Sequence, residues 1–255
     1  LSQWEFQYEK GNFTIPFPSK VKGDDTFTVP LSKFYDVIDT ERLLPDDLAS
    51  YQSYIEERHR KMIALTFDDG PDPTTTPQAL AILKKYNAKA TFFMVGKNVS
   101  ANPDIAKRVR KEGHQIGNHT WDHPQLPKLS LDNAKKEILD TQEAIQKATG
   151  VQTKITRPPY GAINNAIQYS VDQSFIMWDV DSLDWKTHNT TAILNEVKKE
   201  VKPGSIILMH DIHQTTIDAL PTVLDYLKSQ GYTFVTVDEL LDYQLESHRI
   251  YYNGN

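Results

Sequence analysis

Two adjacent aspartates, Asp68 and Asp69, follow the apolar run MIALTF at residues 62–67. The run predicts a buried strand, and a carboxylate at its end costs several kcal/mol to bury unless it is paired or bound to a metal. A strand that runs into an Asp-Gly turn is the ordinary explanation of this pattern. A metal site is the functional explanation, because a cation offsets the repulsion between neighbouring carboxylates.

The segment HTWDH places two histidines, His119 and His123, four residues apart. On a helical turn both imidazoles would lie on one face and could share a metal ion; a pair of solvated histidines is the alternative. The chain has no cysteine, so any metal site must use His, Asp or Glu, and Asp69 is a natural third ligand. Two histidines and one carboxylate leave coordination positions open, as in catalytic metal sites. We therefore expect one divalent cation, zinc in the first place, with Co2+, Ni2+, Mn2+ and Fe2+ as alternatives.

Adjacent side chains at a strand end point in different directions. Asp69 can therefore bind the cation while Asp68 faces water that the metal activates, and Asp68 would then serve as a general base. Other ionisable residues stand where further apolar runs end: Arg157 at the end of TKITR, Asp181 and Asp184 after SFIMWDV, and His210 at the end of SIILMH.

The elements that would position these groups alternate regularly from residue 61 onward. Apolar strand-like runs occur at 62–67, 90–95, 114–118, 153–157, 174–180, 205–210 and 232–237. Apolar residues spaced by three and four predict helices between them, at 74–87, 103–113, 130–150, 190–204 and 215–231. Such alternation predicts an α/β fold with a parallel sheet, here a distorted (β/α) barrel of seven or eight strands. In such barrels chemistry is carried at the carboxyl ends of the strands, where the residues named above would converge.

Residues 1–58 differ from the remainder of the chain in being rich in aromatic residues, proline and polar residues. The runs FTIPF and TFTVPL predict strands, and residues 43–60 predict a helix, but no catalytic constellation occurs there. We expect 1–58 to be an N-terminal extension or the tail of an upstream domain, and 59–255 to be the catalytic domain.

The composition restricts the class of partner. The 255 residues carry a formal net charge of −6 with interspersed charges, which disfavours a nucleic-acid partner. No apolar run is long enough to predict a transmembrane segment in this chain. The absence of cysteine excludes disulfides and thiolate chemistry. The first residue is not Met and no signal peptide is recognisable, which suggests a mature or trimmed form.

Five motifs in order resemble those of the family 4 carbohydrate esterases, the polysaccharide deacetylases with a NodB-homology domain. They are TFDDG, HTWDH, RPPYG, DSLDW and LMHD, within residues 61–241. The resemblance is closest to bacterial peptidoglycan N-acetylglucosamine deacetylases. It implies that 59–255 is a polysaccharide deacetylase domain, that its partner is an acetylated polysaccharide, and that the protein is extracellular or associated with the cell surface and cell wall.

The resemblance also implies roles for the motif residues. Asp68 would be the catalytic base, Arg157 would hold it in place, and Asp69, His119 and His123 would bind the metal.

In the remaining motifs His210 would be the general acid and Asp184 its partner. The backbone N–H of Tyr160 would help to bind the oxyanion, Trp185 would wall the acetyl pocket, and Leu208 would touch the acetyl methyl group. Trp178 and His213 are interpreted instead as a core residue and a solvated loop residue.

The expected reaction is hydrolysis of an N-acetyl group by a metal-activated water, with an Asp base and a His acid. An O-acetyl esterase acting on a glycan such as xylan is the nearest alternative. A glycosidase using Asp68 and Asp184 as its two carboxylates would leave both metal-site histidines and His210 unexplained. A non-haem iron oxygenase and a non-catalytic carbohydrate-binding protein are further alternatives, and neither uses a separate acid and base.

Overall fold

The computed structural model describes residues 7–9, 12–16, 26–30, 45, 49–50, 53 and 61–254, and the chain separates into two compact units, Leu1–Arg58 and His59–Asn255. In the first unit β1 (Gln7–Glu9), β2 (Asn12–Pro16) and β3 (Thr26–Pro30) form an antiparallel sheet. The strands expected at FTIPF and TFTVPL are thus present as β2 and β3. The helix expected over 43–60 lies mostly outside the described residues, although positions 45, 49, 50 and 53 are helical.

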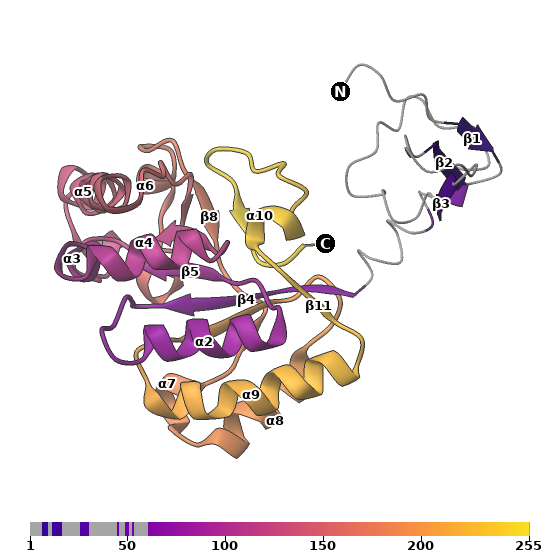
Figure 1. Cartoon of the computed structure of the whole chain (residues 1–255). Coiled ribbons are helices and arrows are strands. Elements are labelled where there is room, and N and C mark those ends of the chain that lie inside the picture. The colour runs from indigo at the N-terminus through magenta and orange to yellow at the C-terminus, as the bar shows by residue number, and fades with distance from the viewer. Residues whose placement is uncertain are drawn as a thin grey trace. The chain divides into compact units, whose positions relative to one another are not determined.

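The second unit is built on a sheet of parallel strands that follows the order β12-β8-β7-β6-β5-β4-β10-β9, with β11 pairing the start of β4 (Figure 1). No pairing among the described residues joins β12 to β9, so the barrel is incomplete on that side. This confirms the predicted distorted barrel. The strands are β4 (Met62–Asp68), β5 (Thr91–Met94), β6 (Gln115–Asn118), β7 (Ile155–Thr156), β8 (Ser174–Ile176), β9 (Val180–Asp181), β10 (Ile206–His210), β11 (Thr233–Val235) and β12 (Ile250–Tyr251).

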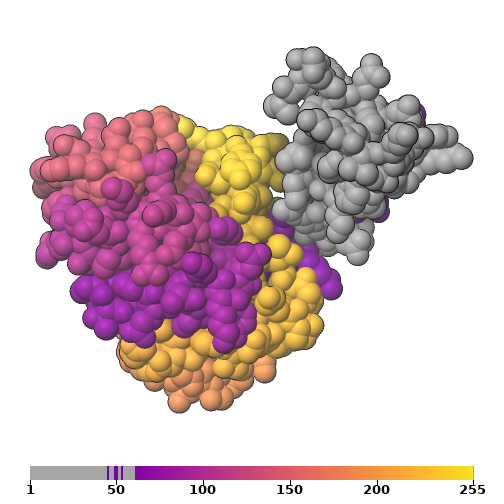
Figure 2. Space-filling model, in the orientation of Figure 1, coloured from indigo at the N-terminus to yellow at the C-terminus, as the bar shows by residue number. Residues whose placement is uncertain are grey.

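Helices follow the strands and pack outside the sheet (Figure 1), and the space-filling view shows that the segments of the second unit pack closely against one another on the visible face (Figure 2). None of the helices in the described part of the chain is long and apolar enough to cross a membrane. The five predicted long helices are present as α2, α4, α5, α8 and α9. The helices are α2 (Thr76–Tyr86), α3 (Gly96–Ala101), α4 (Pro103–Lys111), α5 (Leu131–Thr149), α6 (Asn165–Gln168), α7 (Asp184–Thr187), α8 (Thr190–Glu200), α9 (Gln214–Ser229) and α10 (Val237–Leu240).

The strand cores explain why these runs form the centre of the molecule. Every residue of β4 is buried, and the β10 residues before His210 are buried as well. Parallel strands with helices against them bury both faces, which is why they appear in the sequence as nearly continuous apolar runs.

The register of β4 and β10 places the two most important strand ends together. Asp68 and His210 are direct register partners on these neighbouring parallel strands. Register partners on adjacent strands project to the same face of the sheet, about 5 Å apart at the backbone. The sequence placed both residues at strand ends; their direct pairing is an observation of the structure.

The run SFIMWDV, expected as one strand over 174–180, is interrupted. It forms two short strands, β8 and β9, with Met177–Asp179 between them. The cause is a buried guanidinium: Arg157 donates hydrogen bonds to the carbonyl oxygens of Ile176 and Met177. Backbone acceptors that serve a side chain are withdrawn from the sheet ladder at that point.

Candidate active site

A cavity of about 410 Å³ lies at the carboxyl ends of the central strands. Pro158, Trp178 and Asp181 line it, together with eight of the ten residues nominated from the sequence. The other two, Arg157 and Asp184, are fully buried. The eight are Asp68, Asp69, His119, His123, Tyr160, Trp185, Leu208 and His210.

Asp68 and Arg157 form a buried ion pair. Arg157 Nη1 donates to Asp68 Oδ1 at 2.8 Å, and neither side chain is more than 4% exposed. Three more guanidinium hydrogens go to Thr66 Oγ1 and to the carbonyl oxygens of Ile176 and Met177, so four of the five hydrogens of the buried cation have acceptors. The pair fixes the orientation of the Asp68 carboxylate and leaves Oδ2 without a guanidinium partner.

The chain leaves strand β4 at Asp69. The Asp69 φ of 76° lies in the left-handed region, so the backbone turns immediately after Asp68. Asp69 Oδ1 lies 3.4 Å from the Nε2 atoms of both His119 and His123. The ligand atoms of these three residues all lie within 4.8 Å of one another.

Two observations show that this group fits a divalent cation. Asp69 Oδ1 is buried and has no hydrogen-bond partner among the described residues. His119 Nδ1 lies 2.7 Å from the Arg157 carbonyl oxygen, which only accepts, so Nδ1 must carry the hydrogen. In the neutral imidazole, Nε2 of His119 then carries the lone pair, which lies toward Asp69, the arrangement in which a second contact orients a metal-binding imidazole.

The HTWDH segment differs from its expected form. It is an irregular loop instead of a helical turn, with φ values of 66° at Thr120 and 57° at His123. The two imidazoles nonetheless lie close together, with ring centroids 4.9 Å apart. The two imidazoles are therefore brought together by the left-handed residues and the proline after His123, and not by the spacing of a helix.

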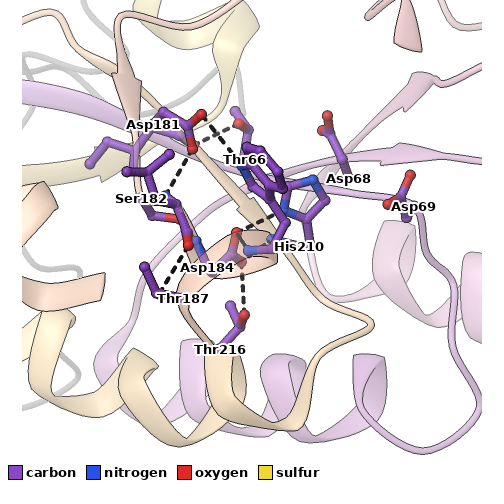
Figure 3. A network of polar contacts seen from close by, with 12 residues as sticks. Thr66, Asp68, Asp69, Asp181, Ser182, Asp184, Thr187, His210 and Thr216 are labelled. Atoms are coloured by element: carbon purple, nitrogen blue, oxygen red, sulfur yellow. Dashed lines mark hydrogen bonds and ion pairs between the residues drawn. The ribbon is translucent and has the colours of Figure 1, made fainter. Parts of the chain in front are cut away.

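His210 and Asp184 form the second buried pair of the site. His210 Nδ1 contacts Asp184 Oδ1 at 2.8 Å, and the His210 backbone N–H donates to Asp184 Oδ2 at 2.7 Å. Thr216 Oγ1 also donates to Oδ2, and the Trp185 backbone N–H donates to Oδ1. Figure 3 shows Asp184 lying between His210 and Thr216. Both oxygens of this carboxylate are thus occupied, which leaves His210 Nε2 as the free nitrogen of the ring.

The charges around His210 favour its protonated form. Burial by itself lowers the pKa of the imidazole, but the hydrogen bond and charge of Asp184, with the charges of Asp68 and Asp69, raise it to about 9. The pKa of Asp184 is lowered: burial raises it, but the contacts with His210 and Thr216 outweigh burial. His210 is therefore an imidazolium at neutral pH, with a proton available on Nε2.

Aromatic and apolar residues form the walls of the cavity. Tyr160 has a φ of 61°, its ring meets His123 edge-on at 4.8 Å, and its backbone N–H has no hydrogen-bond partner among the residues the structure describes. Leu208 is buried, whereas Trp185 is half exposed and its Nε1 donates to Asp181 Oδ2 at 3.5 Å.

Three wall residues were not nominated from the sequence. Trp178, interpreted as a core residue, does pack against a core cluster but also lines the cavity. Asp181 stands in the DSLDW motif three residues before Asp184, and that spacing was the available indication. Pro158 carried no indication beyond its place in RPPYG.

A larger hollow of about 560 Å³ lies at the amino ends of β5 and β6. It is lined mainly by cationic side chains, among them Lys84, Lys89, Arg108 and Lys111. Two of these are already engaged, since Lys89 donates to the Glu112 carbonyl oxygen and Arg108 pairs with the Glu112 carboxylate. In barrels of this kind chemistry is placed at the opposite, carboxyl face, and none of the nominated residues lines this hollow.

Comparison with known proteins finds similarity along nearly the whole chain. Residues 55–174 match the polysaccharide deacetylase family, and residues 1–52 match the peptidoglycan GlcNAc deacetylase N-terminal domain. The chain is 41% identical to the peptidoglycan-N-acetylglucosamine deacetylase PgdA of Listeria monocytogenes over 99% of its own length and 55% of that protein. It is 45% identical to the peptidoglycan-N-acetylmuramic acid deacetylase PdaC of Bacillus subtilis over 71% of its own length and 39% of that protein. The chain thus spans about half or less of these two relatives.

The solved structure of a family 4 acetyl xylan esterase from Clostridium thermocellum, in complex with a cobalt ion, is also similar. It shares 36% identity with a TM-score of 0.72, over 76% of this chain and 98% of that one. The similarity therefore extends over a complete solved domain of that protein and includes the fold as well as the sequence. The chain belongs to the polysaccharide deacetylase family.

Proposed function

We propose that this protein hydrolyses the N-acetyl group of N-acetylglucosamine in peptidoglycan, releasing acetate and leaving a free amine on the sugar. The observation that carries the proposal is the pairing of a guanidinium-held carboxylate with a carboxylate-held imidazolium on adjacent strand ends. One group is arranged to accept a proton and the other to donate one, across a single cavity.

The proton transfers balance with one water molecule. Asp68 takes a proton from the water as the water oxygen attacks the acetyl carbonyl carbon. The N–H of Tyr160 donates to the carbonyl oxygen as negative charge develops there, an interaction worth roughly 3 kcal/mol in comparable sites. His210 then gives its Nε2 proton to the departing nitrogen, and the C–N bond breaks. Loss of the proton from Asp68 to solvent and uptake of a proton by His210 restore the starting state.

Asp69, His119 and His123 would hold the metal ion, for which we propose zinc. When bound, a divalent cation at this position lowers the pKa of water and polarises a carbonyl oxygen. The unpartnered Asp69 Oδ1 and the fixed tautomer of His119 support the assignment. Cobalt fits the same ligand set, and the similar acetyl xylan esterase was solved with that ion.

The geometry disfavours two other reactions. A two-carboxylate glycosidase needs Asp184 to reach a sugar, but Asp184 is fully buried and both its oxygens accept hydrogen bonds. An iron oxygenase would share the three metal ligands but has no use for a separate base and acid pair.

The location of the protein and its division into domains belong to the proposal as well. We place the protein outside the cell, at the wall, because peptidoglycan is named as the substrate of the relatives. We assign 59–255 as the catalytic domain and 1–58 as an N-terminal unit, which the separate family match of residues 1–52 supports.

The test is an acetate-release assay on N-acetylglucosamine polymers, isolated peptidoglycan and acetylated xylan, with the metal removed by chelation and then restored. We expect release from peptidoglycan that depends on the metal. Release from xylan alone would replace the proposal with an O-acetyl esterase. Release only from N-acetylmuramic acid residues would change the sugar while keeping the reaction.

Metal content supplies a second measurement that does not depend on turnover. His119→Ala should lose bound metal, whereas His213→Ala, which removes an imidazole close to His210 but outside the ligand group, should keep it. Equal metal content in both variants would refute the ligand assignment.

A further inference from the structure

Asp211 follows His210 directly and is fully buried, yet no step of the proposed reaction uses it. Its Oδ2 accepts a hydrogen bond from Thr76 Oγ1, while its Oδ1 is buried with no partner among the described residues. Thr76 Oγ1 in turn accepts from the Asp72 backbone N–H at 2.8 Å. The Asp211 carboxyl group is therefore linked to the loop that follows Asp69, not to its own strand.

Gly70 lies against this carboxyl group. A Cβ added at Gly70 would lie 2.6 Å from both oxygens of Asp211 and 2.9 Å from its Cγ, and these are the three nearest atoms. Real Cβ atoms do not approach other atoms so closely, so Gly70 and Asp211 fit together only because Gly70 has no side chain. The contact joins the residue after a metal ligand to the residue after the general acid.

Two other contacts of the loop that follows Asp69 come from the region of β5 and α3. The Asn98 side chain donates to the Asp69 carbonyl oxygen at 2.7 Å, and the Val95 backbone N–H donates to the Gly70 carbonyl oxygen at 2.9 Å. Both residues lie at the end of β5 or in α3. Asp211 is thus the group by which the strand of His210 contacts the same loop.

Beyond Asp68 and His210 the strands β4 and β10 no longer pair. The contact between Gly70 and the Asp211 carboxyl group lies directly after this last pair, one residue beyond Asp69 and one residue beyond His210. A change of about 1 Å in the distance from His210 to the Asp69 ligand can reduce the rate by about a hundredfold, because the acid must reach a nitrogen held relative to the metal group.

We propose that Asp211 is a positioning residue that sets the separation between the general acid on β10 and the metal-ligand loop after β4, through its contact with Gly70 and its hydrogen bond with Thr76. This proposal rests on the proposed function. The geometry assigns the role to the shape and hydrogen bond of Asp211, with Gly70 as its matched partner.

A double-mutant cycle tests the contact. Gly70→Ala introduces the clash and Asp211→Ala removes the carboxyl group; each should lower kcat by at least about tenfold with little change in KM. In the double variant the new Cβ occupies part of the space that Asp211 leaves, so kcat should exceed the value expected from multiplying the two single effects. Multiplicative losses, or an Asp211→Ala variant with wild-type kcat, would overturn the proposal.

Conservative variants separate shape from charge. Asp211→Asn keeps the shape and an acceptor for Thr76 and should keep most of the kcat. A loss equal to that of Asp211→Ala would mean that charge is required, and the spacing role would be wrong. Metal content should stay unchanged in Asp211→Asn and fall in Gly70→Ala, which gives a readout other than turnover.

Thr76 provides the milder variants that are needed if Asp211→Ala fails to fold. Thr76→Ser keeps the hydroxyl donor and should keep kcat, whereas Thr76→Val removes it and should lower kcat while thermal unfolding remains cooperative. Equal kcat in the two variants would contradict the proposal. If the wild type releases no acetate from any substrate while metal content still falls in Gly70→Ala, the proposed function fails and the loop contact stands.

Discussion

The two buried ion pairs of the site differ in which partner, the cation or the carboxylate, faces the cavity. In the Asp68–Arg157 pair the cation is fully buried and the carboxylate faces the cavity; in the His210–Asp184 pair the carboxylate is fully buried and the cation faces the cavity. Each inner partner is fixed by further hydrogen bonds, Arg157 by Thr66 and backbone carbonyls, and Asp184 by Thr216 and backbone N–H groups.

The difference shows how a single cavity can present a fixed carboxylate and a protonated imidazole together. The buried guanidinium of Arg157 fixes the orientation of the Asp68 carboxylate, and the buried Asp184 carboxylate stabilises the protonated form of His210. In each pair the residue that faces the cavity has a role in the proposed reaction, and the residue behind it holds it in place. Four changes, ordered by expected effect, test this inverted arrangement.

Asp68→Asn should give the largest effect, because the amide keeps the shape and the contact with Arg157 but cannot take a proton. We expect kcat to fall by about 10⁴-fold, the upper range for a general base. Bound metal should remain at the wild-type level, since the ligand atoms are unchanged. Full activity in this variant would remove the base assignment, and lost metal would make the result a defect of the ligand group.

His210→Ala should lower kcat by about 10²–10⁴-fold on an amide substrate. The loss should be smaller on an O-acetyl ester, because an alkoxide leaves with less help from a proton than an amine nitrogen does. His213→Ala is the matched control: its ring centroid is 6.0 Å from that of His210, but no hydrogen bond to Asp184 holds it. Equal losses on amide and ester would contradict the role of His210 as the acid.

Asp184→Asn should move the pH profile more than it lowers the maximum rate. His210 must be protonated, and its pKa of about 9 predicts that activity falls as pH rises through about 9. Without the Asp184 charge, burial lowers the pKa of His210, so the alkaline limb should move to lower pH. An alkaline limb in the wild-type position would show that Asp184 does not control this proton.

Lys97→Ala should have the smallest effect of the four changes, because it breaks an exposed ion pair and not a buried one. Lys97 in α3 forms an ion pair at 3.2 Å with Asp122, a residue of the HTWDH loop, but both side chains are about two-thirds exposed. Exposed pairs are screened by water and contribute little. Wild-type kcat and thermal unfolding are expected, and a large loss would mean that exposed charges near the site also matter.

The sequence identified Asp68, His119 and His210 because each stands at the end of an apolar run or directly after it, whereas Tyr160, Trp185 and Leu208 followed from the resemblance of the motifs. Asp68 and His210 could be placed in this way, since parallel strands bring their carboxyl ends together. The complete burial of Arg157 could not be predicted, because it depends on acceptors from the interrupted run at 176–177, which is distant in sequence. The left-handed conformation of Tyr160 could not be predicted either, because an aromatic residue rarely adopts it by local preference.

The direct pairing of Asp68 with His210 has a consequence for how this protein can change over time. Inserting or deleting one residue within either strand would turn the affected side chain to the other face of the sheet and separate proton donor from proton acceptor in one step. A loop outside these strands, such as 188–189 between α7 and α8, can instead lengthen or shorten without changing the register of β4 and β10. Diversification toward new acylated polymers is therefore expected to proceed through length changes in the rim loops, while β4 and β10 keep a constant length.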